Sequence, residues 1–168
     1  MVKKTEESLG ANLDTLISGY VTRGVFRAAG SPTKINNTYV YDINWFQDQN
    51  MILRIDSRRS TVQLNDFIPT ITPRSSLDRR LRMWLQDRAS PAVPAHRRLD
   101  ASQFQLKLTC RAGHMQLSMV QHENDMLLAT RKMIQIVNEL YLDFLLEPAQ
   151  YDWIIETFEL DPDNPTWP

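Results

Sequence analysis

The sequence predicts an α+β domain in which an antiparallel sheet of about five strands lies against helices. Apolar and polar residues alternate over 38–46, 51–55, 62–64 and 103–120, as in strands that bury one face. From Asp125 to Glu147 apolar residues recur at helical spacing instead, in the longest amphipathic run of the chain. A three-strand meander and a hairpin would therefore form the sheet that this long helix covers.

The N-terminal part of the chain is expected to supply one helix and the meander. Residues 5–20 have the apolar spacing of a helix, which Gly19 is expected to end. The segment 21–29 is expected to add a short strand. Turns are predicted at 48–50 and 58–60, where polar residues interrupt the alternation.

A short helix is predicted over residues 75–88, because Ser75 and Asp78 approximate a capping box at its start. Prolines follow this helix, so residues 89–98 are predicted to form an extended, Pro-rich linker inside the domain. The later hairpin is predicted to turn at Ala112 and Gly113.

The limits of the long helix and of the domain are also predicted. Asn124 is a good N-cap residue, and Pro148 should stop the long helix. Proline is well tolerated at a helix start, so 149–158 should form a further short helix. These elements make one domain over residues 1–160, and residues 161–168 (DPDNPTWP) are expected to be a flexible acidic tail or, alternatively, a short docking peptide.

Charge is distributed unevenly along the chain, although the net charge is only −1. Residues 54–98 contain ten arginines and four aspartates, whereas residues 121–168 contain ten acidic and two basic residues. These opposite charges are expected to neutralise each other within the fold or a dimer, or else to present two poles to partners.

The sequence contains no motif that points to catalysis, a cofactor or a metal. A Gly-rich phosphate loop, a Cys-x-x-Cys pair and an HExxH helix are all missing. A metal pair of His114 and His122 would lack a third ligand of matching spacing. The acidic residues on the last helices could form a catalytic carboxylate pair, but the same spacing is typical of a solvated helix face. We therefore expect a non-enzymatic protein with no small-molecule ligand. Its single cysteine, Cys110, and the lack of a long apolar run favour a cytoplasmic protein that does not enter a membrane.

The order of predicted elements is helix, three-strand meander, short helix, hairpin and long helix. Together with its final part, QFQLKLTCRAGHMQLSMVQHENDMLLATRKMIQIVNELY, this order resembles the type III secretion chaperone-like fold, which includes the YbjN-type bacterial regulator domains. The resemblance covers residues 5–158 and is one of element order. It implies a small acidic domain, often dimeric, that binds proteins, and it transfers no functional residue to this chain.

These observations predict a bacterial, cytoplasmic protein-interaction domain of chaperone-like or regulatory type that forms a homodimer. The expected contact surface combines apolar residues of the two main helices with arginines that steer an acidic partner or the acidic end of the same molecule. The predicted partner-binding residues are Leu77, Arg79, Arg80, Leu81, Trp84, Leu85, Leu128, Leu142 and Leu146. The alternative is a nucleic-acid-binding regulator that uses the arginine-rich segment 74–98.

Overall fold

A computed structural model describes residues 2–163, without the side chains of residues 2–7 and Gln47. Residues 164–168 of the predicted tail lie outside the described part. The helices are α1 (Val2–Thr22), α2 (Ser76–Asp87), α3 (Met126–Glu139) and α4 (Tyr151–Phe158), with single turns η1 (Phe46–Asp48), η2 (Leu140–Phe144) and η3 (Pro148–Gln150). The strands are β1 (Ala28–Ala29), β2 (Thr33–Ile35), β3 (Thr38–Asn44), β4 (Asn50–Asp56), β5 (Thr61–Asn65), β6 (Phe104–Arg111) and β7 (His114–Gln121).

The α+β fold class is confirmed, and the sheet has seven strands rather than about five. Its order is β1-β3-β4-β5-β7-β6, with β2 also paired to β3, and every pair is antiparallel. The additional strands are β1, which forms only the last two residues of the strand expected over 21–29, and β2, whose three residues are too few to produce a readable alternation. Helix α1 takes up the start of the expected strand, as far as Thr22.

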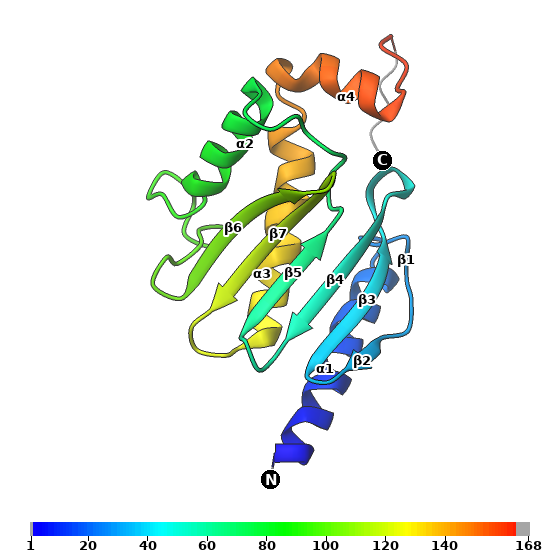
Figure 1. Cartoon of the computed structure of the whole chain (residues 1–168), viewed down its shortest axis with the longest axis vertical. Helices are drawn as coiled ribbons and strands as arrows, with labels where there is room; N and C mark the ends of the chain where they lie inside the picture. The colour runs from blue at the N-terminus through cyan, green and yellow to red at the C-terminus, as the bar shows by residue number, and fades with distance from the viewer. Residues whose placement is uncertain (1, 164–168) are drawn as a thin grey trace.

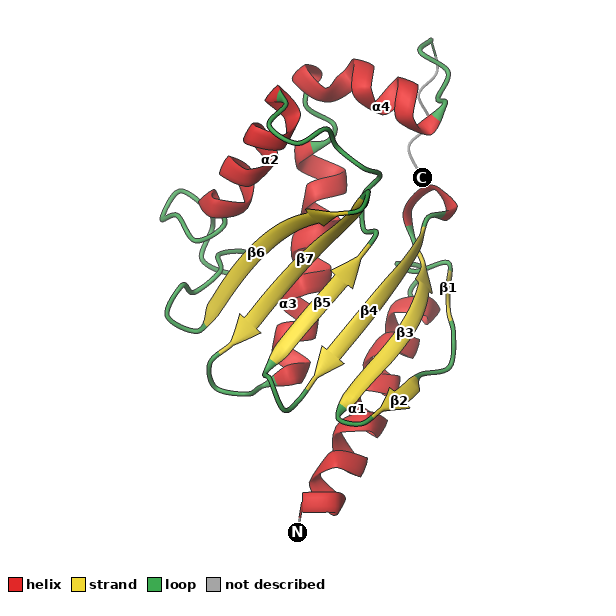
Figure 2. Ribbon diagram, in the orientation of Figure 1, coloured by secondary structure: helices red, strands yellow, loops and turns green. Residues whose placement is uncertain are grey.

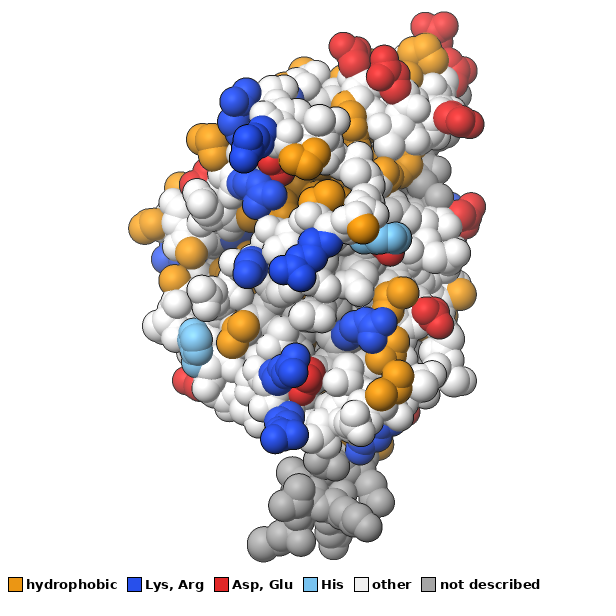
Figure 3. All heavy atoms as spheres, viewed as in Figure 1, with side chains coloured by type: hydrophobic (Ala, Val, Ile, Leu, Met, Phe, Trp, Pro, Cys, Tyr) orange, Lys and Arg blue, Asp and Glu red, His pale blue; other side chains and the backbone are white. Residues whose placement is uncertain are grey.

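The sheet is covered on one face only. Helices α1 and α3 lie behind it in Figure 1, and α2 lies beside the β6 edge (Figures 1 and 2). Alternate residues of β3, β4 and β5 are buried beneath the helices, which confirms the predicted alternation. No helix among residues 2–163 covers the opposite face, where polar side chains, scattered Lys and Arg, and single hydrophobic residues are exposed (Figure 3).

A row of aromatic rings links distant parts of the core. Phe26 contacts Trp45 with ring centroids 4.8 Å apart, and Trp45 stacks on Phe46 at 4.7 Å. Phe46 in turn stacks on Tyr141 at 4.0 Å. Tyr141 also contacts Phe158 of α4, at 6.4 Å. The segment after α1, the β3–β4 connection and the two C-terminal helices thus share one packed cluster.

Helix ends differ from the sequence expectation at several places. The α-helical part of the long helix ends at Glu139, and a π turn, η2, follows it to Phe144, before Pro148. Helix α1 continues past Gly19 to Thr22, and the chain turns at Gly24, where φ is +73°. The N-cap of α3 is Asp125, whose carboxylate accepts a hydrogen bond from the Leu128 N–H at 3.0 Å, and Asn124 instead adopts a left-handed conformation. The hairpin turn at Ala112–Gly113 and the short helix after Pro148 form as predicted.

Candidate functional site

Strand β6 forms an edge of the sheet: one side pairs with β7 and the other faces away from the sheet (Figure 1). The His122 N–H donates to the Gln103 carbonyl at 2.9 Å. In an antiparallel pair the residues that bond to the neighbouring strand alternate, so Gln105, Lys107 and Thr109 also direct their backbone groups toward β7. The intervening residues direct theirs outward. These outward-facing residues are Phe104, Leu106, Leu108 and Cys110.

Two of the outward-facing backbone groups already have partners. The Phe104 N–H donates to the Asp100 carbonyl at 2.9 Å, and the Leu108 carbonyl accepts from Arg82 Nη1 at 3.1 Å. Within residues 2–163, neither the N–H nor the C=O of Leu106 has a hydrogen-bond partner outside the sheet. The centre of this edge is therefore open to another extended chain.

A groove of about 670 Å³ runs along this edge, between β6, α2 and the loop that joins them. This volume lies in the range of about 300–1,000 Å³ that is usual for ligand sites. The residues that line the groove are Arg82, Leu85, Gln86, Ala89, Leu99, Ala101, Phe104, Gln105, Leu106, Lys107, Leu108 and His122. This described lining combines an apolar floor with two permanent cations and contains no Asp or Glu.

Asp78 fixes the start of α2 and the direction of Arg82. The Asp78 N–H donates to Ser75 Oγ at 3.1 Å, as the predicted capping relationship requires. The buried Asp78 carboxylate accepts from the Arg74 N–H at 2.9 Å and from Arg82 Nε at 3.0 Å. Arg82 is thereby held over β6, where it reaches the Leu108 carbonyl.

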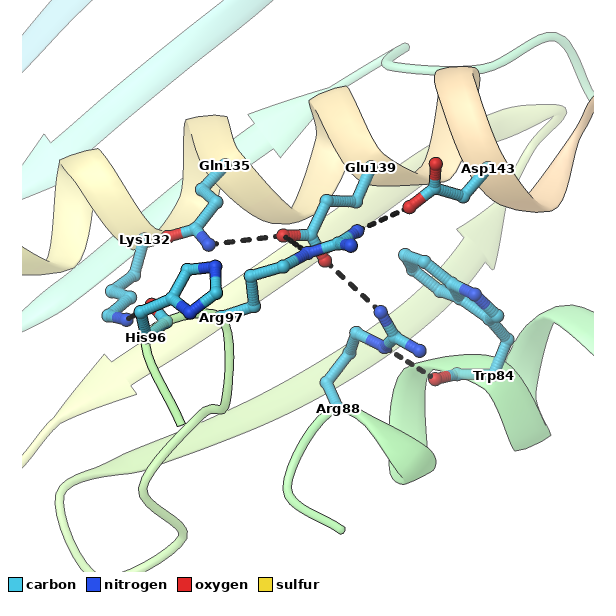
Figure 4. A network of polar contacts seen from close by, with 8 residues as sticks. All are labelled: Trp84, Arg88, His96, Arg97, Lys132, Gln135, Glu139 and Asp143. Atoms are coloured by element: carbon cyan, nitrogen blue, oxygen red, sulfur yellow. Dashed lines mark hydrogen bonds and ion pairs between the residues drawn. The ribbon is translucent and has the colours of Figure 1, made fainter. Parts of the chain in front are cut away.

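Glu139 of α3 binds the segment that joins α2 to β6 (Figure 4), and Ala89, Leu99 and Ala101 of that segment line the groove. The Glu139 carboxylate accepts from Arg88 Nη1 at 3.1 Å, from Arg97 Nε at 2.8 Å and from Gln135 Nε2 at 3.0 Å. Arg97 also pairs with Asp143. Burial on its own would raise the pKa of Glu139, but the hydrogen bonds from Arg97, Gln135 and Arg88 hold that pKa below its ordinary value of 4.5.

The segment 89–98 is consequently a compact loop rather than the extended linker predicted from its prolines. Arg98 donates to the carbonyls of Val93 and Pro91, and the Leu99 N–H donates to the Arg88 carbonyl at 2.8 Å. The ion pairs of Arg88 and Arg97 with α3 join the basic middle of the chain to its acidic end. Part of the charge asymmetry is thus neutralised within the fold, one of the two outcomes expected from the sequence.

Three of the predicted contact residues on α2 belong to the core. Leu77, Leu81 and Leu85 are buried, with Leu81 fully inaccessible. The apolar stripe of this helix attaches it to the rest of the domain, so in the folded chain these predicted partner-binding leucines are not exposed to a partner. Only Leu85 reaches the groove, as part of its floor.

The remaining predicted residues of α2 flank the groove without lining it. Trp84 is half-buried, 4.0 Å from the Arg88 guanidinium and 5.7 Å from the Phe144 ring. Arg80 donates to the Ala149 carbonyl at 3.1 Å and so ties α2 to the segment before α4, and Arg79 is exposed.

The three leucines predicted on the long helix do not form one surface. Leu142 and Leu146 are 43% and 48% exposed, whereas Leu128 is half-buried against the core. Leu128 lies in the first turn of α3, about 21 Å along the helix from Leu142. Leu142 and Leu146 remain the exposed apolar pair of this region.

The sequence did not point to Leu106, Lys107 or Leu99 as members of a site. The alternation around Leu106 and Lys107 predicts a strand, but only the strand order shows that β6 is at an edge of the sheet. Leu99 joins the lining of the groove only because the loop before β6 folds back beside the strand. The metal pair that the sequence analysis argued against does not form, because His114 and His122 lie at opposite ends of β7. His114 instead lies 2.9 Å from Asp66.

Comparison with protein-family models, with curated proteins and with solved structures finds no match for this chain. None of the described helices combines the length and the apolar character needed to cross a bilayer. Among the described side chains of residues 8–163, no group of three His, Cys, Asp or Glu residues is arranged to hold a metal ion.

Proposed function

We propose that this chain is a non-enzymatic protein-interaction domain that binds an extended segment of a partner protein as an additional strand beside β6. The proposal rests on the outward N–H and C=O of Leu106, which have no partner among the described residues and lie at the side of an apolar groove. Backbone hydrogen bonds to an edge strand supply affinity in this mode of recognition, and pockets for alternate side chains supply specificity.

The groove indicates the chemistry of the segment. Every second side chain of an added strand points to the same face, so apolar residues at alternate positions would contact Leu85 and Leu99. Arg82 places a positive charge at the groove, Lys107 places a second on the neighbouring uncovered face of β6, and the described lining has no carboxylate. An extended segment with alternating apolar and acidic residues fits these surroundings best.

The order α1, β3–β5, α2, β6–β7 and α3 is the one on which the resemblance to chaperone-like domains rests. That resemblance supports a protein partner and a homodimer, and a cytoplasmic location belongs to the same proposal. Leu142 and Leu146 are the apolar pair through which two copies would associate.

Nucleic-acid binding through residues 74–98 is less well supported. Arg88 and Arg97 pair with Glu139, Arg82 pairs with Asp78, and Arg98 donates to carbonyls of its own loop. These guanidinium groups would have to give up intramolecular partners before they could bind phosphates.

The test measures binding of a fluorescent peptide of alternating Val and Glu by anisotropy. Leu106→Pro removes the outward N–H and no hydrogen bond to β7, so the variant should fold but lose binding. Leu106→Ala is the matched control, because it trims the same side chain, keeps the N–H and should retain binding. Equal binding by both variants would contradict strand addition.

A second measurement leaves the protein unchanged. Peptides methylated at alternate backbone nitrogens should divide into two classes, because only one set of amides faces β6 in an added strand. Equal affinity for the two sets would exclude the proposed pairing.

A further inference from the structure

Arg82 covers one end of the open edge. Its Nη1 donates to the Leu108 carbonyl at 3.1 Å, and its Nε pairs with Asp78 at 3.0 Å. The Leu108 carbonyl faces away from β7, so it is one of the groups to which an added strand would bind. Arg82 and an incoming peptide N–H therefore approach the same carbonyl from the same side.

The two contacts of Arg82 differ in their surroundings. Asp78 is buried, accepts from both the Arg74 N–H and Arg82, and is fixed at the start of α2. The contact with Leu108 crosses from the helix to the strand, and the Arg82 side chain is 43% exposed there. Docking of a strand would rotate the outer nitrogens of Arg82 away from Leu108 while Nε stays with Asp78.

We infer that Arg82 determines the specificity of this site by exchanging its hydrogen bond to Leu108 for a carboxylate of the incoming segment. The inference rests on the proposed strand addition and adds a reason why the segment must be acidic. A neutral segment displaces the Arg82–Leu108 hydrogen bond and offers the guanidinium no charged acceptor to replace it. An acidic side chain at the adjoining position offers it a charged acceptor, which makes a stronger hydrogen bond than a carbonyl.

The described surroundings contain no competing acid for the released nitrogens other than Asp78, which already binds Arg82 Nε and the Arg74 N–H. Lys107 lies between Leu106 and Leu108 in β6, so its side chain projects to the opposite, uncovered face of the sheet. Lys107 can add general attraction for acidic segments, whereas only Arg82 is placed to link charge recognition to the free edge.

The experiment compares two fluorescent peptides, one alternating Val with Glu and the other alternating Val with the neutral isostere Gln. Wild-type protein should bind the Glu peptide about ten-fold more tightly, as one charged hydrogen bond allows. Arg82→Gln should lose this preference because the Glu peptide binds more weakly, while the Gln peptide binds as well as before or better. Arg82→Lys keeps the charge and should restore part of the preference.

Arg79→Gln is the matched control, since it removes the same charge from an exposed position of the same helix outside the groove. Unfolding curves for all variants would establish that they fold. The inference is overturned if Arg82→Gln still binds the Glu peptide more tightly than the Gln peptide. It is also overturned if Arg79→Gln loses this preference to the same extent, because the preference would then come from long-range attraction to positive charge.

The two proposals fail in different ways. Wild-type protein that binds both peptides equally, with binding lost in Leu106→Pro, would leave strand addition intact and refute the role of Arg82. If neither peptide binds wild-type protein, strand addition itself is refuted, and the role of Arg82 falls with it.

Discussion

Arg97 Nε lies 2.8 Å from Glu139 Oε1, although the two residues are 42 positions apart in the chain. The same carboxylate accepts from Arg88, at the other end of the loop that contains Arg97. One buried side chain thus binds the segment between α2 and β6 at two points, and Ala89, Leu99 and Ala101 of this segment line the candidate groove.

Replacing Glu139 with Gln should destabilise the protein by about 2 kcal/mol, because two guanidinium groups lose their charged acceptor in a partly buried place. Urea unfolding would measure the change. Asp143→Asn is the control: the Asp143 side chain is 51% exposed, so its loss should cost less than about 1 kcal/mol. Equal effects of the two substitutions would contradict the central position of Glu139.

The contribution of Glu139 should depend on pH. Its folded-state pKa is lowered from the ordinary value of 4.5, so its ionised form stabilises the fold fully above that value. The stabilisation should disappear as the pH falls from 4.5 through the folded-state pKa. The difference in unfolding free energy between wild type and Glu139→Gln, measured from neutral to acidic pH, should therefore shrink in that window. A difference that stays constant or grows on acidification would refute this account.

Leu81→Ala should cost about 3 kcal/mol of unfolding free energy, because the side chain is fully buried where α2 packs on the domain. Met83→Ala, on the same helix, removes a side chain that is 63% exposed and should change stability by less than about 0.5 kcal/mol. Chemical denaturation of both variants would compare them. Similar effects would mean that the α2 leucines are accessible, as the sequence had suggested.

Self-association should depend on the apolar pair at the end of the long helix. If two copies join through Leu142 and Leu146, the double substitution to Glu should give a monomer in light scattering at concentrations where wild type is a dimer. Met83→Glu also places a charge on an exposed apolar residue and should leave the dimer intact. A dimer that survives the double substitution would place the interface elsewhere.

Much of the fold follows from local patterns. Alternation identifies β3, β4, β6 and β7, and Pro148 marks the break before α4, because these signals depend on neighbouring residues alone. Strand β2 is missed because three residues carry no readable period. Asn124 and Asp125 both suit an N-cap, and only the position of the first helical turn decides between them.

The candidate site depended on features that no local pattern contains. Strand β6 looks like any half-buried strand until the order β5-β7-β6 places it at an edge. The prolines of residues 89–98 suggest an extended chain, whereas its ion pairs with Glu139 and Asp143 are contacts across the sequence. Arg82 was visible as a basic residue, but its position over Leu108 requires the folded helix and strand.

The stacked rings from Phe26 to Tyr141 have a consequence for synthesis on the ribosome. Trp45 and Phe46 are made early, but their cluster is closed by Tyr141 and Phe158, close to the end of the chain. Domains fold as units during synthesis, and surface that is still unpaired at that stage promotes aggregation. A nascent chain that stops before Tyr141 would therefore lack the ring that stacks on Phe46, and this uncovered aromatic surface would be a target for a ribosome-associated chaperone.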